Sequence, residues 1–287
     1  MQKRKSVTTL TKENSLPCIS MSRGATMQQQ GVELQGNVAI VTGASRELGA
    51  AMAEALAGAG AAVLVAHCAE PELADTVVER IIARGGQAAA HDADCSSVAA
   101  NQQLVAHAVA LWGRLDIFVA NAGITMSRSF LETDEAMWDR LSNLNLKGSF
   151  FGAQAAARQM IAQPAQGTGG RIVFSSSVTG VRAVPNLAAY GVTKAGLIHM
   201  ARVLGFELGR YGITVNALGI GATVNERNLR DDPQYAEHWD SVMPTGRVGQ
   251  PADVAAALMF LVRADAAMVN GHTLMIDGGW TTYSPVP

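Results

Sequence analysis

Three side chains near the middle of the chain have the types and spacing to act together on a carbonyl group: Ser177, Tyr190 and Lys194. An apolar strand predicted at 171–174 runs on towards Ser177, and an apolar segment of helical length begins at Leu187. Tyr190 and Lys194 are four residues apart, so they share one face of that helix. A lysine ammonium beside a phenol stabilises the phenolate that a general acid/base needs, and Ser177 can offer its hydroxyl to the same carbonyl. Because such a Tyr/Lys pair also arises by chance on many helices, other motifs have to show whether this pair has a function.

A glycine-bearing turn at 42–49 (TGASRELG) separates a predicted strand at 37–41 from a predicted Ala-rich helix at 50–59. Such a turn suits the pyrophosphate of a dinucleotide, because the helix N-terminus offers free N–H groups and glycine lets the backbone approach phosphate. The alternative is a glycine-rich turn that holds no ligand.

Together these motifs resemble the short-chain dehydrogenase/reductase family. Ser177, Tyr190 and Lys194 match its Ser and Tyr-x-x-x-Lys pattern, and the turn matches its T-G-x-x-x-G-x-G pattern, with Glu47 in place of the middle glycine. Further matches follow in chain order: Asn121-Ala122-Gly123, Asn145 and Asp277-Gly278-Gly279. The resemblance covers residues 36–280. It implies an α/β fold of the doubly wound Rossmann type, a single domain with a seven-stranded parallel sheet and helices on both faces.

The resemblance also implies a catalytic role for four residues. Hydride moves between nicotinamide C4 and a carbonyl carbon, while Tyr190 gives or takes the proton of the substrate oxygen. Lys194 assists the tyrosine and binds the nicotinamide ribose, and Ser177 orients and polarises the substrate oxygen. Asn145, expected in a long helix at 134–160, maintains a water relay. The resemblance implies no metal.

The cofactor site that the resemblance implies consists of Gly43, Ser45, Arg46, Leu48, Gly49, His67, Asp94, Asn121, Ala122, Gly123, Tyr190, Lys194, Gly221 and Thr223. His67 follows a strand predicted at 61–66, where NAD-binding relatives carry an acid. Arg46 matches a position that pairs with the 2'-phosphate in NADP-dependent relatives. NADP(H) is therefore favoured, and NAD(H) is possible. We expect Glu47 to point outward from the first helical turn, where the helix dipole favours an acid, rather than to clash with the pyrophosphate.

Some of these matches have a plainer interpretation. Asp94 is either the aspartate that contacts adenine or an acid near a helix N-terminus, which Ser96 or Ser97 would cap equally well. The Asn-Ala-Gly motif at 121–123 also suits an ordinary turn after a strand predicted at 115–120.

The last strand-to-loop connection departs from the family pattern. After a strand predicted at 212–217, Ile220 replaces a proline, and the family's threonine position falls on Asn225, although Thr223 is close enough to serve. We expect residues 222–246, with approximate bounds, to form a polar, partly helical lid. Its charges suit a polar or acidic substrate, but a solvated surface explains them as well and is the favoured explanation.

Composition limits the partners. The 287 residues are 48% hydrophobic and 16% charged with a net charge of -2, which suits one α/β domain. This balance lacks the basic footprint expected for nucleic acid or an anionic membrane surface, and no run of about 18 apolar residues spans a bilayer. Three widely spaced cysteines without CxxC or His pairing indicate neither a disulfide framework nor a zinc site, and favour a reducing, cytoplasmic setting.

The predicted domain covers 36–287, and the polar stretch 1–35 is expected to be a disordered tail. It is too polar for a signal peptide, which leaves a transit peptide, a vector-derived leader or a misassigned start codon, since Met21 and Met27 also precede the predicted domain. Two helices, 134–160 and the one after Leu187, are apolar nearly all round. A partner subunit would cover the outer faces, so we expect a homo-oligomer, a dimer or tetramer.

The predicted function is NAD(P)-dependent hydride transfer to a small-molecule carbonyl or from a secondary alcohol. A 3-oxoacyl-thioester reductase-like carbonyl reductase is favoured, and a sugar or polyol dehydrogenase of the glucose dehydrogenase type is the alternative. An acyl-carrier-protein partner would need basic residues near the site, for which the candidates are Arg128, Arg182, Arg227 and Arg230. From another class, an inactive dinucleotide-binding homologue would explain Glu47 and Ile220, but would have no use for the intact catalytic residues.

Overall fold

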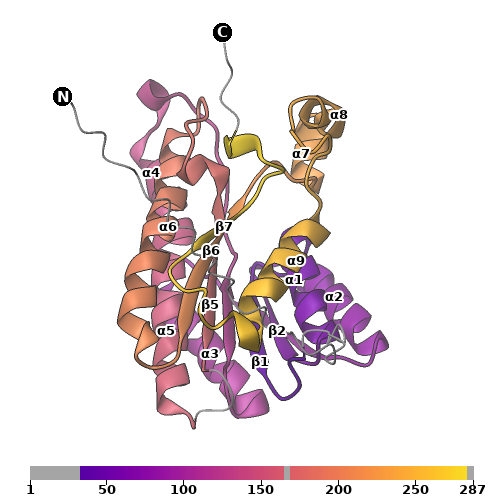
Figure 1. Cartoon of the computed structure of the whole chain (residues 1–287), viewed down its shortest axis with the longest axis vertical. Helices are drawn as coiled ribbons and strands as arrows, with labels where there is room; N and C mark the ends of the chain where they lie inside the picture. Colours follow the sequence, from indigo (N-terminus) through magenta and orange to yellow (C-terminus); the bar gives the residue numbers. More distant parts are fainter. Residues whose placement is uncertain (1–32, 165–168, 283–287) are drawn as a thin grey trace, which may run out of the picture. The chain divides into compact units, whose positions relative to one another are not determined.

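The structure, a computed structural model, describes residues 33–164 and 169–282 (Figure 1). The predicted tail at 1–35 therefore lies outside the described residues except for its last three. Of those, Leu34 is buried, and its backbone N–H donates to the carbonyl of Ala59. The packed chain thus includes Leu34.

A parallel sheet forms the centre of the described chain, and it confirms the predicted doubly wound α/β fold. Its strand order is β3-β2-β1-β4-β5-β6-β7. The strands are β1 (Val38–Thr42), β2 (Ala62–His67), β3 (Gln87–Asp92), β4 (Ile117–Ala120), β5 (Arg171–Ser177), β6 (Thr214–Ile220) and β7 (Thr273–Ile276). The inner strands are buried on both faces, which is why they read as continuous apolar runs in the sequence. The order reverses between β1 and β4, and a ligand crevice is expected at that point.

Helices cover both faces of this sheet (Figure 1). One apolar cluster joins the sheet to α1 (Glu47–Gly58), α2 (Pro71–Ala83) and α9 (Pro251–Val262). A second joins the opposite face to α3 (Val98–Trp112), α5 (Ser149–Ala162) and α6 (Ala188–Gly209). Short 3-10 turns lie at η1 (Phe130–Glu132), η3 (Val178–Gly180), η4 (Ala264–Ala266) and η5 (Trp280–Thr282).

The helix predicted at 134–160 exists, but it is not regular. It comprises α4 (Glu135–Leu141), a π-helical segment η2 (Ser142–Gly148) and α5. Such π-helical turns are rare and are frequent at functional sites. Asn145 lies in this segment, with its side chain fully buried.

The predicted lid at 222–246 is partly helical, with α7 (Glu226–Asp231) and α8 (Tyr235–Asp240). In Figure 1 these two helices lie beyond the ends of the strands and off the layers that cover the sheet. We call residues 222–246 the lid segment. Strand boundaries differ from the predicted ones by a few residues, with two consequences: His67 ends β2 instead of following it, and Ile220 ends β6.

Candidate active site

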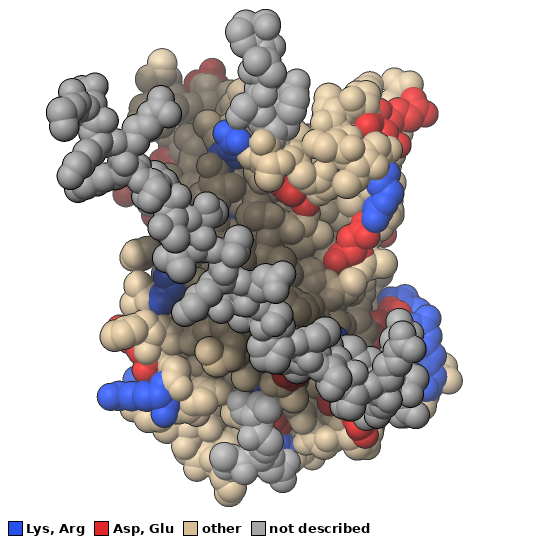
Figure 2. Space-filling model, in the orientation of Figure 1, with Lys and Arg blue, Asp and Glu red and all other residues tan. Residues whose placement is uncertain are grey.

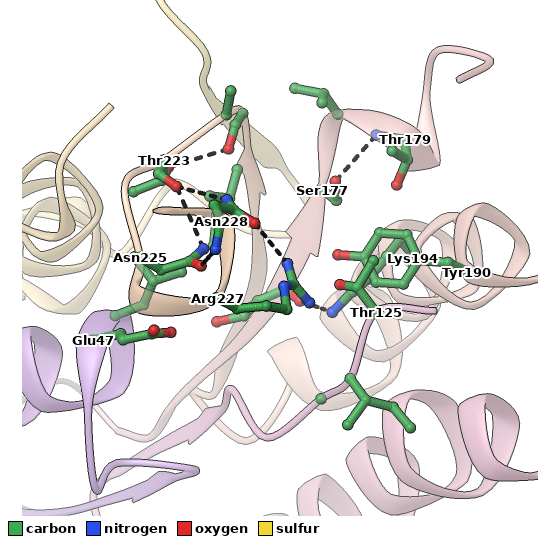
Figure 3. Close-up of a pocket in the computed structure, with 18 of the residues that line it drawn as sticks. Glu47, Thr125, Ser177, Thr179, Tyr190, Lys194, Thr223, Asn225, Arg227 and Asn228 are labelled. Atoms are coloured by element: carbon green, nitrogen blue, oxygen red, sulfur yellow. Dashed lines mark hydrogen bonds between the residues drawn. The ribbon is translucent and has the colours of Figure 1, made fainter. Parts of the chain in front are cut away.

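A pocket of about 680 Å³ lies beside the carboxyl ends of the strands, and it gathers the predicted reactive side chains (Figure 3). Ser177, at the end of β5, lines it together with Tyr190 and Lys194 from α6. The glycine-bearing turn lines it through Arg46 and Leu48, the loop after β4 through Asn121 and Gly123, and the chain after β6 through Gly221 and Thr223.

Lys194 is held in place by β5. Its side chain is buried, and Nζ donates a hydrogen bond of 2.8 Å to the carbonyl of Ser175. The hydroxyl of Ser176 donates to the backbone carbonyl of Lys194, also at 2.8 Å, so strand and helix are tied at this level. Nζ lies 5.5 Å from the ring centroid of Tyr190. A fixed ammonium therefore lies beside the phenol that a general acid/base would use.

Ser177 is buried, and its Oγ accepts a hydrogen bond of 3.2 Å from the backbone N–H of Thr179. Because the oxygen accepts this bond, the hydroxyl proton stays available to donate to a group in the pocket. Ser177 and Tyr190 can therefore offer two hydroxyl groups to a single oxygen atom.

Asn145 does not line the pocket; it lies behind it. Its Nδ2 donates to the carbonyl of Ile124 at 2.9 Å and to Oγ1 of Thr193 at 3.2 Å, while Oδ1 accepts from the N–H of Ile124 at 2.9 Å. One side chain thus connects the π-helical segment to the loop after β4 and to α6. This geometry keeps the two walls of the pocket in register.

The glycine-bearing turn is built around Asn121. Its Nδ2 donates to the carbonyls of Thr42 and Gly43 at 3.0 and 3.1 Å, and Oδ1 accepts from the hydroxyl of Ser175 at 3.0 Å. Oγ1 of Thr42 in turn accepts the N–H groups of Asn121 and Ala122, both at 2.9 Å. The turn, β4 and β5 are therefore fixed to one another beside the start of α1.

Gly49 shows why this turn needs glycine. A Cβ there would lie 2.1 Å from the carbonyl oxygen of Gly43 and 2.9 Å from Nδ2 of Asn121. Gly43 itself has a φ of +61°, which glycine adopts readily. The result is a tight cradle at the N-terminus of α1, and its shape and free N–H groups fit the pyrophosphate of a dinucleotide.

A family model described as Enoyl-(Acyl carrier protein) reductase matches residues 43–281. The chain belongs to the short-chain dehydrogenase/reductase family. It is similar to 2-dehydro-3-deoxy-D-gluconate 5-dehydrogenase of Dickeya dadantii, with 36% identity over 249 residues, 86% of this chain and 96% of that protein. It is also similar to a 3-oxoacyl-[acyl-carrier-protein] reductase of Synechocystis, with 36% identity over 253 residues, 87% of this chain and 99% of the relative.

Among solved structures, a short-chain dehydrogenase from Burkholderia cenocepacia in complex with NADP has a TM-score of 0.81 and 36% identity, covering 88% of this chain and 100% of that one. The similarity extends over nearly the whole described chain. This short-chain dehydrogenase/reductase is therefore an NAD(P)-dependent oxidoreductase that acts on CH–OH and C=O groups.

Two residues of the predicted cofactor site lie away from the pocket of this short-chain dehydrogenase/reductase. His67 is buried, and its Nδ1 accepts the backbone N–H of Glu70 at 3.2 Å. Asp94 is exposed, and its Oδ1 accepts the N–H of Ser96 at 2.9 Å, while Ser97 caps α3. Gly43, Ser45 and Gly49 of the glycine-bearing turn and Ala122 of the loop after β4 do not line the pocket either; Gly43 and Ala122 hydrogen-bond to Asn121 and Thr42 instead.

The departures from the family pattern have local explanations. Ile220 pairs with Ile276 in the sheet and packs in the core, as an apolar strand residue can. Asn225, at the family's threonine position, caps α7 by accepting the N–H of Asn228 at 2.8 Å. Thr223 lines the pocket, and its hydroxyl donates to the carbonyl of Gly221 at 3.1 Å.

Glu70 is the residue near the cofactor site that the sequence did not indicate. Its carboxylate forms an ion pair with Arg46 and accepts a hydrogen bond of 2.5 Å from the hydroxyl of Ser45. Arg46, expected to be open to a 2'-phosphate, thus has an acidic partner within the chain. The family pattern looks for this acid at the end of β2, and Glu70 lies three residues further on, so the pattern gave no signal for it.

Proposed function

We propose that this short-chain dehydrogenase/reductase interconverts a ketone and a secondary alcohol on a small carboxylate-bearing substrate, of the oxo- or hydroxy-sugar-acid class. The observation that carries this proposal is Arg227, on α7 of the lid segment. Its guanidinium lines the same pocket as Tyr190 and Lys194, and Figure 3 shows it extending from the lid segment towards them. A cation facing the reactive groups suits an anionic substrate.

The partners of Arg227 support this assignment. Its Nη2 donates to Oδ1 of Asn228 at 3.1 Å, which is a neutral acceptor. Among residues 33–164 and 169–282, no ion pair with Arg227 is formed, whereas Arg46 pairs with Glu70 and Arg230 with Asp231. A carboxylate is the planar, bidentate partner that such a guanidinium binds best. The first of the two similar proteins described above is named for a sugar-acid substrate.

In the proposed reaction, Tyr190 transfers the proton at the substrate oxygen, and Lys194 stabilises its phenolate. Ser177 donates its hydroxyl to the same oxygen and so positions the reacting carbon. Asn145 holds the loop after β4 and α6 at the spacing that these contacts require. The nicotinamide, when bound, supplies or accepts the hydride.

We further propose that NADP(H) is the favoured cofactor and that NAD(H) is also accepted. Arg46 is the only cation of the glycine-bearing turn, and β2 ends in His67 without an acid at that position. Gly43, Gly49 and Asn121 shape the pyrophosphate cradle. Gly123 and Thr223 both line the pocket, and a Cβ at Gly123 would lie 3.5 Å from Nζ of Lys194, so Gly123 suits the nicotinamide half.

A 3-oxoacyl-thioester reductase is the second candidate. Trp239 and Trp280 meet edge to face at 5.9 Å on the pocket wall, and an acyl chain could pack there. The candidates for a carrier-protein surface are less favourable, because Arg128 lies 3.8 Å from Asp134 and Arg182 donates to the carbonyl of Thr281. In the face drawn in Figure 2, Lys/Arg and Asp/Glu side chains lie interspersed.

We propose a homo-oligomer, a dimer or tetramer, in the cytoplasm. Large apolar side chains are exposed along α4, α5 and α6: Trp138 43%, Phe150 40%, Val192 53%, Val203 40% and Phe206 88%. A second copy of the chain would cover them. Within the described residues no helix is both long and apolar enough to cross a membrane. Light scattering of the wild type and of Phe206→Glu tests the oligomer, because a charge in this surface should shift the mass towards the monomer.

The substrate proposal is tested by steady-state kinetics on sugar acids, neutral sugars of equal carbon number, and acetoacetyl-CoA. Arg227→Gln should lower kcat/KM for a sugar acid at least about tenfold, with little change for a neutral sugar. Arg230→Gln is the matched control: Arg230 is on the same helix and also lines the pocket, but it is 74% exposed and already paired with Asp231. Equal loss on charged and neutral substrates, or turnover of acetoacetyl-CoA alone, would refute the sugar-acid assignment. NADPH titration of Arg227→Gln separates a substrate role from binding of the cofactor's phosphates.

A further inference from the structure

The segment between β2 and α2 folds back on itself in a strained conformation. Ala69 has a φ of +54°, a left-handed value that an alanine adopts only at a cost of about 1 kcal/mol or more. Two side chains hold it there: Oδ1 of Asp92 accepts the N–H of Ala69 at 3.1 Å, and Nδ1 of His67 accepts the N–H of Glu70 at 3.2 Å. Strain that neighbouring groups compensate in this way suggests a function for the conformation.

The consequence of this fold-back is the position of Glu70. Its side chain is 27% exposed and meets the glycine-bearing turn, where one carboxylate oxygen pairs with Arg46 and the other accepts the hydroxyl of Ser45. Arg46 is 45% exposed, and its other charged neighbour is Glu226 of the lid segment, at 4.0 Å. The guanidinium that would bind a 2'-phosphate is therefore already neutralised.

We propose that Glu70 is a specificity-determining residue: a built-in counter-ion of Arg46 that a 2'-phosphate must displace and that a ribose 2'-hydroxyl can hydrogen-bond. The inference rests on the proposed use of NADP(H) with NAD(H) as the second cofactor. A carboxylate opposes a phosphate at the same guanidinium by charge repulsion, whereas it accepts a hydrogen bond from a hydroxyl. Glu70 thus reduces the preference for NADP(H) that Arg46 alone predicts. His67 and Asp92 act as positioning residues for it.

Calorimetric titration with 2',5'-ADP and 5'-AMP tests the proposal without turnover. Glu70→Gln should bind 2',5'-ADP about tenfold more tightly than the wild type and 5'-AMP no more tightly, because only the first ligand carries the 2'-phosphate. Glu72→Gln, an exposed acid in the first turn of α2, is the matched control and should change neither affinity. Ser45→Ala, which loosens Glu70 without removing its charge, should shift the ratio of affinities in the same direction as Glu70→Gln but less.

The outcomes separate this inference from the proposed function. If Glu70→Gln is folded by circular dichroism and the ratio of the two affinities is unchanged, the inference is wrong even though the enzyme works. If the wild type binds neither nucleotide and neither NADPH nor NADH, the proposed function itself fails. If Glu70→Gln does not fold, Glu70→Ala and Ser45→Ala are titrated with the same two nucleotides instead. An unchanged ratio of the two affinities in both variants would overturn the proposal.

Discussion

The carboxylate of Glu47, in the glycine-bearing turn, accepts a hydrogen bond of 2.8 Å from the backbone N–H of Glu226, the first residue of α7 in the lid segment. Glu47 has a φ of +51°, so it occupies a left-handed position where the family pattern has glycine. An acid at a helix N-terminus also meets the favourable end of the helix dipole. The substitution of glycine by glutamate therefore ties the cofactor turn to the lid segment.

Glu47→Gly should release this connection. It removes the left-handed strain, worth about 1 kcal/mol, and with it one hydrogen bond of similar value, so the free energy of unfolding should change little. The amide hydrogen of Glu226 should instead exchange faster. Hydrogen exchange followed by mass spectrometry measures this, and Glu47→Gln, which keeps an acceptor oxygen, should exchange more slowly than Glu47→Gly. Equal exchange in wild type and Glu47→Gly would contradict the connection.

Tyr190→Phe should lower kcat by at least about a hundredfold, because the substrate oxygen loses its proton donor and acceptor. NADPH binding, followed by fluorescence titration, should remain within a few-fold of the wild type, since the cradle at Gly43 and Gly49 is untouched. Tyr211→Phe, just beyond the end of α6, is the control and should keep full activity. Turnover that survives Tyr190→Phe would exclude the proton-transfer role.

The sequence predicts the sheet and part of the pocket lining because both depend on local signals. Apolar runs of strand length fix the sheet, and the spacing of Tyr190 and Lys194 follows from the period of a helix. The ion pair of Glu70 was missed because it depends on the fold-back at Ala69, and no propensity predicts a left-handed alanine. The π-helical segment was missed for a related reason: the apolar pattern of 134–160 is also that of an ordinary helix, and only the tertiary contacts of Asn145 distinguish the two.

Asn145→Ala should destabilise the protein. Its amide satisfies the N–H and the carbonyl of Ile124 and contacts Thr193, and removal leaves the two partly buried groups of Ile124 without this partner at a cost of about 1–3 kcal/mol. Urea unfolding measures the loss. Asn143→Ala, exposed in the same π-helical segment, should be close to neutral and serves as control. If Asn145→Ala is as stable as the wild type and has a normal kcat, Asn145 has neither the structural role nor the catalytic role assigned to it.

The stability of the protein should depend on His91 below neutral pH. Its ring stacks on that of His107 with centroids 4.3 Å apart. Burial lowers the pKa of His91 below its ordinary 6.5, His107 lowers it further, and Asp92 opposes the change. The unfolded chain therefore takes up the proton first, so stability is complete above pH 6.5 and is lost as the pH falls through that value.

Urea unfolding at about pH 7.5 and about pH 5.5 tests this expectation. Between these two pH values, the free energy of unfolding should fall less in His91→Gln than in the wild type. His199→Gln, an exposed histidine on α6, should behave like the wild type. If His91→Gln loses as much unfolding free energy as the wild type between the two pH values, another titrating group causes the pH dependence of stability.

Gly49→Ala should damage the cofactor turn, whereas Gly58→Ala in the same helix should not. A Cβ at Gly49 would meet the backbone of Gly43 and Ala44 at 2.1 and 2.8 Å, and neither atom can move without opening the turn. We expect a loss of about 1–3 kcal/mol in the free energy of unfolding and weaker NADPH binding. Nothing lies within 4 Å of a Cβ at Gly58, near the end of α1, so alanine there should stabilise by about 0.5–1 kcal/mol. Urea unfolding and NADPH titration of both variants distinguish a specific cradle from a general sensitivity of α1 to substitution. Only the cradle predicts that alanine lowers the free energy of unfolding at Gly49 and raises it at Gly58, nine residues further on.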